Sequence, residues 1–545
     1  MKITFHFFIA FPSICCAFSY SSYDPNLSKK NVLSSSADTL VTCSAHMSAS
    51  YPHISCDDTT DPVSVSDEDS LDVREEELKL LDTLCALLGI SAPDVYFSTG
   101  RDGERGMYTK RDIETDNIIM KIPLSSCIRD DQPPSWLQDE VISDSDYVHT
   151  QVLDPSKWAT RLASSLIDKR FNIHNLFSSN NNNNNFDEDL KEDFEEDNIK
   201  SGIQKWLDAM PNPEFLRASL PVHWSEETLL NAKCTALELA VDSSYFARGE
   251  AVHDIIQSLQ RSLEDENKKQ NKKIKALEGV DLDKICQDVL DIVQTRSCRL
   301  EAPGGAQWGP PLRVLAPVFD YINHGSSQSL KGAGFANAYF GLEKCPSKGN
   351  ISIVVRARTN ISSDEEILVD YGVSAHPAWR CLASYGFVPE YGNLLMEDDD
   401  EEEEDTEVED VAEVYMNGRR FEVGRYTIPT ELVETAYESL VIEQNEFSNP
   451  EQYEILYQYT TTNSNDNHQQ DVKPLLSPIV ATRLAKRISD AAFALLLHSE
   501  KEQLYEDGND SPNSIISERL AAALRWSQHR VLRDCADSLR EYSTE

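Results

Sequence analysis

The sequence predicts an α+β fold in which a β-rich part carries a long helical insert and is followed by an all-α C-terminal domain. Alternating apolar residues at 351, 353 and 355, followed by an apolar run at 367–369, are typical of strands. This pattern is lost from about residue 131 to 294, where apolar residues instead recur every three or four positions. The same helical spacing dominates residues 413–545. With 545 residues, 40% of them hydrophobic, the chain is long enough to bury several cores.

The β-rich part is expected to span residues 78–390 and to begin with a short amphipathic helix. Upstream of it, Asp57 to Ser70 is polar, acidic and poor in aromatic residues, which predicts a linker. The helix is indicated by apolar residues at helical spacing that stop at Gly89. These residues are Leu78, Leu81, Leu84, Cys85 and Leu88.

The insert at 131–294 is predicted to be helical. Trp158, Leu162 and Leu166 form one apolar stripe, and a second begins after the candidate N-cap residue Ser225. Asn180 to Asn185 is a homopolymeric run that no packed element needs, so it predicts an exposed loop inside the insert.

Two apolar stripes define the C-terminal domain at 413–545. Their members recur every three or four residues, which is typical of helices that pack in a core. The stripes indicate packing and do not by themselves indicate a binding surface. They comprise Val480, Leu484, Ile488, Ala491 and Leu495, and then Leu520, Leu524, Val531, Cys535 and Leu539.

The chain is strongly acidic, with a formal charge of −43 from 50 basic and 93 acidic residues. Such a charge repels a phosphate backbone, so nucleic acid is not expected as a ligand, and a basic protein partner fits better. Part of the charge is concentrated in the uninterrupted run Glu397 to Asp405. We interpret residues 391–412 as a solvated, disordered loop, because an acidic run has no apolar surface to bury.

The twelve cysteines are scattered, and none forms a Cys-x-x-Cys pair. No zinc site is therefore expected, and no metal ligands are assigned. The spacing gives no disulfide framework, which favours a reducing compartment.

The N-terminus has the features of a targeting leader. Residues 1–17 join Met1-Lys2 to a short, Pro-interrupted apolar stretch, which predicts a cleavable signal peptide and no stable membrane insertion. Residues 18–70 begin with Phe18 and continue Ser-rich, as in a transit peptide, before the linker. This order resembles the bipartite leader of algae with secondary plastids, so import into a plastid through the secretory route is expected. Ordinary secretion, which fits many unpaired cysteines poorly, and a cytoplasmic location are the alternatives.

Two segments carry the most functional information. Residues 316–324 read Ala-Pro-Val-Phe-Asp-Tyr-Ile-Asn-His, and residues 365–372 read Glu-Glu-Ile-Leu-Val-Asp-Tyr-Gly. Each is expected to end an apolar, strand-like run with side chains that can hold a polar ligand, namely Asn323 and His324 in the first and Tyr371 in the second. Together they predict the mouth of a pocket.

In this order, the two segments resemble the SET domain of protein methyltransferases, and most closely the subgroup of the Rubisco large-subunit methyltransferase. Further segments of residues 100–390 match the same subgroup. They are the Gly-containing turn at 103–109 with its flanking hairpin at 111–123, the Thr-Arg pair at 295–296, and the Tyr-Gly-Phe segment within 379–388. The resemblance implies that the domain is split by the helical insert and followed by a helical substrate-binding domain. It also implies S-adenosyl-L-methionine as the cofactor.

The resemblance assigns a role to individual positions. It makes Tyr371 the catalytic residue at the centre of methyl transfer. Cofactor contacts are implied for Arg105, Gly106, Met107, Thr295, Asn323, His324 and Phe387. Substrate contacts are implied for Arg296, Phe319 and Tyr385.

The implied reaction is N-methylation of a lysine in a non-histone protein by a monomeric enzyme. A free lysine amine, with a pKa near ~10.4, is mostly protonated at neutral pH, and burial beside a positive sulfonium lowers that pKa. Aromatic walls suit such a channel. Two alternatives remain open. One is methylation of a histidine, because Phe319 could hold an imidazole as well as an alkyl amine. The other is an inactive scaffold that binds a protein through its C-terminal helices.

Overall fold

A computed structural model describes residues 67–99, 105–137, 141–142, 152–171, 173, 192–270, 281–301, 311–325, 336–344, 350–371, 377–389, 410–446, 476–496 and 512–544. The predicted leader, the asparagine run at 180–185 and the acidic run at 397–405 lie outside these residues.

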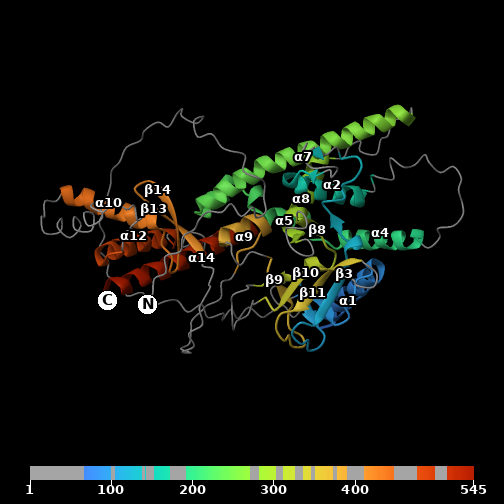
Figure 1. Ribbon diagram of the computed structural model, residues 1–545, viewed down its shortest axis with the longest axis horizontal. Helices are drawn as coiled ribbons and strands as arrows, with labels where there is room; N and C mark the ends of the chain where they lie inside the picture. Colours follow the sequence, from blue (N-terminus) through green and yellow to red (C-terminus); the bar gives the residue numbers. More distant parts are fainter. Residues whose placement is uncertain are drawn as a thin grey trace, which may run out of the picture.

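The described part of the chain mixes sheets and helices, so the predicted α+β class is confirmed (Figure 1). A five-stranded sheet forms the centre of the β-rich part, in the order β3-β11-β10-β12-β9. Its first three strands pair antiparallel, and β12 joins β10 and β9 in parallel. The bounds are β3 (Ile118–Pro123), β11 (Ile351–Ala357), β10 (Ala338–Lys344), β12 (Leu368–Val369) and β9 (Asn323–His324).

Smaller sheets surround this one. The segment predicted to form the opening hairpins, 103–123, supplies β2 (Arg105–Thr109), which pairs antiparallel with β1 (Val95–Thr99), and β3, which pairs with β11. A three-stranded sheet has the order β4-β8-β7, formed by β4 (Ile128–Arg129), β8 (Leu312–Leu315) and β7 (Ser297–Leu300). The predicted strand of alternating residues is β11, in which Ile353 and Val355 are fully buried.

The first helix, α1 (Asp67–Leu88), has the predicted apolar face, with Leu81, Leu84 and Leu88 buried. It ends before Gly89, whose φ of 65° is a conformation that glycine adopts without strain. The predicted linker to Ser70 is too long, because the helix already begins at Asp67.

The insert is helical as predicted, with one correction. The residues of 131–294 include a short antiparallel pair, β5 (Val141–Ile142) with β6 (Val152–Leu153), which has too few residues to give a periodic signal. The predicted cap is confirmed, because the Ser225 hydroxyl accepts from the Thr228 amide at 3.1 Å. The helices are α2 (Trp158–Phe171), α4 (Glu192–Asp208), α5 (Pro213–Ser219), α6 (Glu226–Asn231), α7 (Thr235–Gln270) and α8 (Leu282–Arg296).

The C-terminal part is helical, with α10 (Thr430–Glu446), α12 (Pro478–Leu496) and α14 (Pro512–Thr544). Both predicted stripes lie in its packing, with Val480, Leu484 and Ile488 fully buried. A hairpin of β13 (Val411–Met416) and β14 (Arg419–Gly424) packs against these helices in addition. Its turn is Asn417-Gly418, with φ of 51° and 73°, the residue pair that favours a two-residue hairpin turn.

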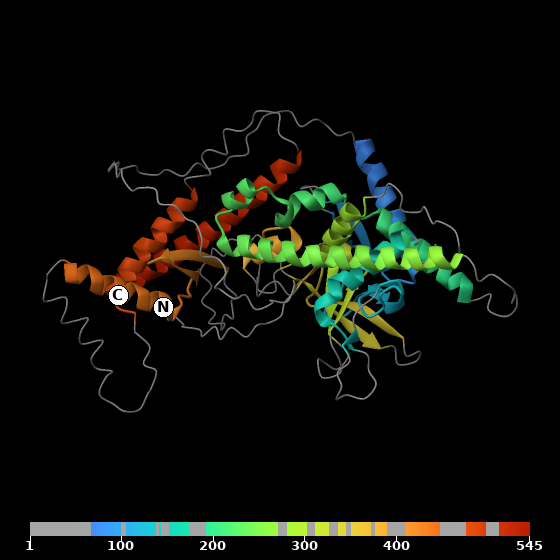
Figure 2. The ribbon, with the colours of Figure 1, turned by 90° about the horizontal axis from the view of Figure 1, so that it is seen from above.

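Helix α7 packs against α2, α8 and α9 (Ala378–Tyr385), and in Figure 2 its first turns lie near the C-terminal helix α14. A small core fixes the junction: Leu237 of α7 packs with Leu524 of α14 and with Ala378 and Leu382 of α9. Beside this core, the buried Asp410 carboxylate accepts from the Ala378 amide at 3.0 Å and from the Ser527 hydroxyl at 2.5 Å. It therefore caps the first turn of α9 from another part of the chain.

Among the described residues, no helix combines the length and the apolar composition that crossing a bilayer requires.

Candidate functional site

Two short parallel strands bring the sequence-distant segments together. In the pairing of β9 with β12, Asn323 lies opposite Leu368 and His324 opposite Val369. The pairing continues at Gly325, whose amide donates to the Val369 carbonyl at 3.0 Å. A side chain at Gly325 would meet the Leu368 Cβ at 2.7 Å, so the close approach requires glycine. The two predicted segments therefore form one site.

The sequence pattern predicted that Asn323 and His324 end the preceding strand, and this prediction is wrong. Strand β8 stops at Leu315, and a 3₁₀ turn at Phe319–Tyr321 separates it from β9. Pro317 cannot donate to a strand neighbour, and Val318 has a φ of 72°, a rare conformation for a β-branched residue. The strained turn re-aims the chain towards β12.

Four rings gather beside these strands. The His324 ring centroid lies 5.3 Å from that of Tyr371 and 5.7 Å from that of Phe387. Tyr385 completes the group at 5.4 Å from Tyr371 and 6.1 Å from Phe387. Tyr385 is the last residue of α9, and Phe387 follows it across Gly386, which takes the left-handed conformation with a φ of 79°. We call His324, Tyr371, Tyr385 and Phe387 the ring cluster.

Strand β2 adds a polar side to the site. The Asn323 side-chain amide donates to the Arg105 carbonyl at 3.1 Å and to the Glu366 carboxylate at 2.8 Å. Gly106 packs directly on that carboxylate, since a Cβ there would lie 2.4 Å from Glu366 Oε1. Met107 contributes through its backbone, whose carbonyl accepts from the Ile367 amide at 2.7 Å, while its side chain is buried.

The other predicted site residues, Thr295, Arg296 and Phe319, lie in different surroundings. Arg296 lies at the end of α8 and donates from Nη1 to the Asp320 carbonyl at 2.7 Å, while its buried Nε has no hydrogen-bond partner. The Thr295 hydroxyl donates to the Asp291 carbonyl at 2.8 Å, within its own helix. Phe319 is only 5% exposed and packs against Phe340 at a centroid distance of 4.7 Å. The structure therefore places Phe319 in the core, away from the ring cluster.

Two groups of the ring cluster, His324 and Tyr371, are neutral at pH 7. Burial lowers the pKa of His324, although the nearby Asp370 opposes this, so the imidazole is uncharged. Burial raises the pKa of Tyr371 to about 12, with Arg296 acting in the opposite direction. The Tyr371 hydroxyl keeps its proton and donates it to the Ile322 carbonyl at 2.6 Å.

The pKa of Asp320 is shifted into the physiological range. Burial raises its pKa to about 6, while Arg296 and the hydrogen bond from Trp206 Nε1, at 3.1 Å, lower it in part. The folded protein therefore binds this proton more tightly than the unfolded chain does. It follows that the free energy of unfolding falls as the pH rises through 6, as far as this group is concerned.

We expect the Asp320→Asn variant to lose this contribution. For wild type, Asp320 should add about 1 kcal/mol to the free energy of unfolding when the pH is lowered from 7 to 5. Asparagine keeps an oxygen for the Trp206 bond and does not titrate. Denaturant unfolding of both proteins at the two pH values measures the difference, and equal pH dependence would contradict the assignment.

Sequence reasoning missed two polar residues of the site. Glu366 stands in the quoted motif but received no role, although it accepts from Asn323. Asn337 links the same strands: its amide donates to the Glu366 carbonyl at 2.8 Å and its oxygen accepts from the Leu368 amide at 2.9 Å. No sequence signal marks Asn337, because its partners are about thirty residues away.

Comparisons with known proteins gave one family model and several solved structures that match this chain. Residues 104–372 match the family model of the SET domain. Solved structures that match include the SET domain of LSMT bound to lysine and AdoHcy, at 13% identity and a TM-score of 0.44, and Rubisco LSMT bound to sinefungin and monomethyllysine, at 14% and 0.43. Each alignment covers 86% of this chain and 92% of the other. A search of curated proteins found no match. Residues 104–372 form a SET domain.

Proposed function

We propose that the chain is a protein methyltransferase that uses S-adenosyl-L-methionine and acts on a lysine side chain of a non-histone protein. The observation that carries the proposal is the convergence of the ring cluster with Asn323 and the Arg105–Met107 backbone, within a SET domain. Three sequence-distant segments thus supply a polar side and an aromatic side to one place.

The residues fit the proposed cofactor. The Asn323 amide and the Arg105 carbonyl are polar groups of the kind that bind an amino acid moiety, and Gly106 lets the Glu366 carboxylate approach the β2 backbone, where any side chain would clash with it. The uncharged His324 puts no positive charge next to a cationic ligand. When bound, the cofactor would supply a methyl group on a sulfonium.

The ring cluster suits the acceptor amine. A lysine must lose its proton before it can act as a nucleophile, and apolar rings favour the neutral form through desolvation. The Tyr371 hydroxyl donates its own hydrogen to Ile322, and a hydroxyl oxygen used in this way can still accept a hydrogen bond from an amine. We infer that Tyr371 and Tyr385 orient the amine while the surrounding rings exclude water.

The donor site can be tested with Asn323→Ala. We expect weaker binding of S-adenosyl-L-methionine by on the order of 1 to 3 kcal/mol, because a polar contact of the half-buried Asn323 is lost. Isothermal titration calorimetry measures both affinities. Asn360→Ala is the matched control, since its exposed amide oxygen accepts from Thr115 in the same domain and should not affect binding. Equal affinity in wild type and Asn323→Ala would remove the assignment.

The acceptor can be identified directly. The protein would be incubated with isotopically labelled S-adenosyl-L-methionine and a protein extract, and labelled residues mapped by mass spectrometry. Label on lysine supports the proposal. Label on histidine would favour the alternative acceptor, and an absence of transfer despite donor binding would favour a scaffold.

A further inference from the structure

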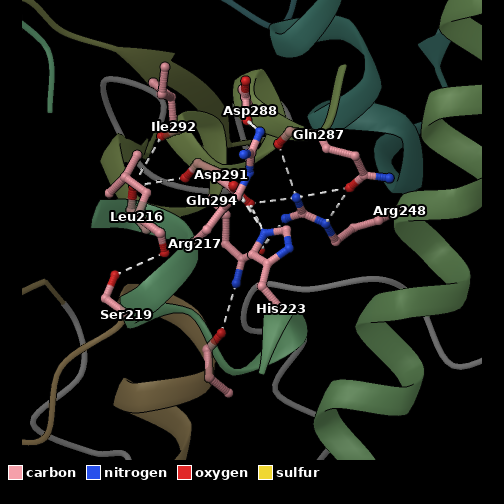
Figure 3. A network of polar contacts seen from close by, with 12 residues as sticks. Leu216, Arg217, Ser219, His223, Arg248, Gln287, Asp288, Asp291, Ile292 and Gln294 are labelled. Atoms are coloured by element: carbon pink, nitrogen blue, oxygen red, sulfur yellow. Dashed lines mark hydrogen bonds and ion pairs between the residues drawn. The ribbon is translucent and has the colours of Figure 1, made fainter. Parts of the chain in front are cut away.

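A buried ionic network lies in the helical insert, behind the ring cluster. Asp291 of α8 is fully buried, and its carboxylate contacts Nη2 of Arg248 at 2.5 Å and Nε2 of His223 at 2.8 Å (Figure 3). Arg248, from α7, is itself only 2% exposed. Charges this deeply buried persist only when they are paired, so the network holds α7 and α8 in one relative position.

The same arginine orients two glutamines of α8. Arg248 Nη1 donates to Gln294 Oε1 at 3.0 Å, and its Nε and Nη2 contact Gln287 Oε1 at 3.3 and 3.2 Å. Because each side-chain oxygen is used as an acceptor, the amide nitrogen of each glutamine is directed elsewhere. The two residues differ in what that nitrogen reaches.

The Gln294 nitrogen reaches the helix that ends at Tyr385, just before Phe387. Gln294 Nε2 donates to the Ala383 carbonyl at 2.7 Å. Ala383 lies in the last turn of α9, where carbonyls lack partners within the helix. Gln294 therefore caps α9 two residues before Tyr385.

The next residues of α8 hold the other side of the site. Arg296 donates to the Asp320 carbonyl, in the 3₁₀ turn that leads into Asn323 and His324. Within three residues, the end of α8 thus contacts α9 through Gln294 and the Asn-His turn through Arg296. The end of α8 therefore sets the distance between α9 and the 3₁₀ turn before Asn323. The Arg248–Asp291–His223 network holds that end of α8 in place.

We infer that Gln294 is a positioning residue that sets the place of Tyr385 and Phe387 relative to His324 and Tyr371. The catalytic part of this inference rests on the proposed function. Gln294 does not touch the reacting groups, and it acts through the Ala383 carbonyl and the end of α9. Misplacement of aligned groups by about 1 Å can slow a reaction on the order of 100-fold, so the effect on methyl transfer should be measurable.

Two isosteric variants isolate the contact. Gln294→Glu keeps an oxygen for Arg248 but replaces the donor to Ala383 with an oxygen that repels the carbonyl. Gln287→Glu is the matched control, because it makes the same change on the same helix, facing the same arginine, and Gln287 Oε1 keeps its role. Gln294→Met removes the donor without adding charge, which covers the case in which the glutamate variant folds poorly.

Hydrogen–deuterium exchange of the full chain measures how well the backbone amides of α9 are protected, and it needs no substrate. We expect faster exchange in residues 378–389 for both Gln294 variants and unchanged exchange there for Gln287→Glu. Wild-type exchange of α9 in both Gln294 variants would overturn the inference, as would an equal change in Gln287→Glu.

Kinetics then test the catalytic consequence. With labelled S-adenosyl-L-methionine and an immobilised library of lysine-centred peptides as the probe, kcat should fall on the order of 10-fold in the Gln294 variants and stay within about 2-fold in Gln287→Glu. A wild-type protein that binds no donor refutes the proposed function, and the exchange data then decide the positioning of α9 alone. An active wild type with equal kcat in all variants overturns the inference and leaves the function standing.

Discussion

Replacing Tyr371 with phenylalanine is expected to slow methyl transfer by on the order of ~100-fold while leaving the affinity for S-adenosyl-L-methionine nearly unchanged. The substitution keeps the ring, which packs 5.3 Å from His324 and 5.4 Å from Tyr385, and removes only the hydroxyl. A preorganised polar group of this kind orients the nucleophile and contributes mainly in the transition state.

The structure explains why this hydroxyl is so well placed. It donates to the Ile322 carbonyl at 2.6 Å, one residue before the Asn-His pair, so it is anchored to the strand that supplies Asn323. Burial raises its pKa to about 12, which keeps it protonated well above neutral pH. We therefore expect the rate advantage of tyrosine over phenylalanine to persist at pH 9.

Single-turnover rates with the peptide library and calorimetry with the donor separate rate from binding. Tyr339→Phe is the matched control, because this tyrosine is 38% exposed on β10 and its hydroxyl contacts Asp116 outside the ring cluster. Wild-type rates in Tyr371→Phe would make Tyr371 a packing residue and remove the central support for the catalytic assignment.

The sequence predicted the parts of the fold that depend on local periodicity. The apolar stripes of α1, α2, α12 and α14 recur at helical spacing, and the structure buries them. The alternation in β11 likewise gave the correct strand. Short elements were missed, because the two-residue strands β5 and β6 have no period, and the Asn417-Gly418 turn of the β13–β14 hairpin was overlooked.

The site could be predicted only in part. Asn323, His324 and Tyr371 stand in segments whose order along the chain is informative, and the structure brings them together in the pairing of β9 with β12. Phe319 follows the strained turn at Val318 and packs against Phe340, and its contact with substrate stays a prediction. The capping of α9 by Asp410 and Gln294 depends on contacts 32 and 89 residues apart, which no local pattern encodes.

Removing the Asp291 carboxylate should destabilise the protein more than any other change considered above. In Asp291→Ala, Arg248 would stay buried at 2% exposure with its counter-charge gone, and breaking a buried ion pair on one side costs about 3 to 5 kcal/mol. Gln287 and Gln294 would still contact the guanidinium, but neither carries a charge. We expect a clear drop in the midpoint of denaturant unfolding, followed by circular dichroism.

Two comparisons identify the unpaired charge as the cause. His223→Ala keeps the Arg248–Asp291 pair and loses one contact from a side chain that is 20% exposed, so it should cost only about 1 kcal/mol. The double variant Arg248→Met/Asp291→Leu removes both charges and should be more stable than Asp291→Ala alone, because apolar residues can replace a buried ion pair with little net cost. If the double variant were instead as unstable as Asp291→Ala, the lost packing and hydrogen bonds of the network, and not the isolated arginine, would account for the destabilisation.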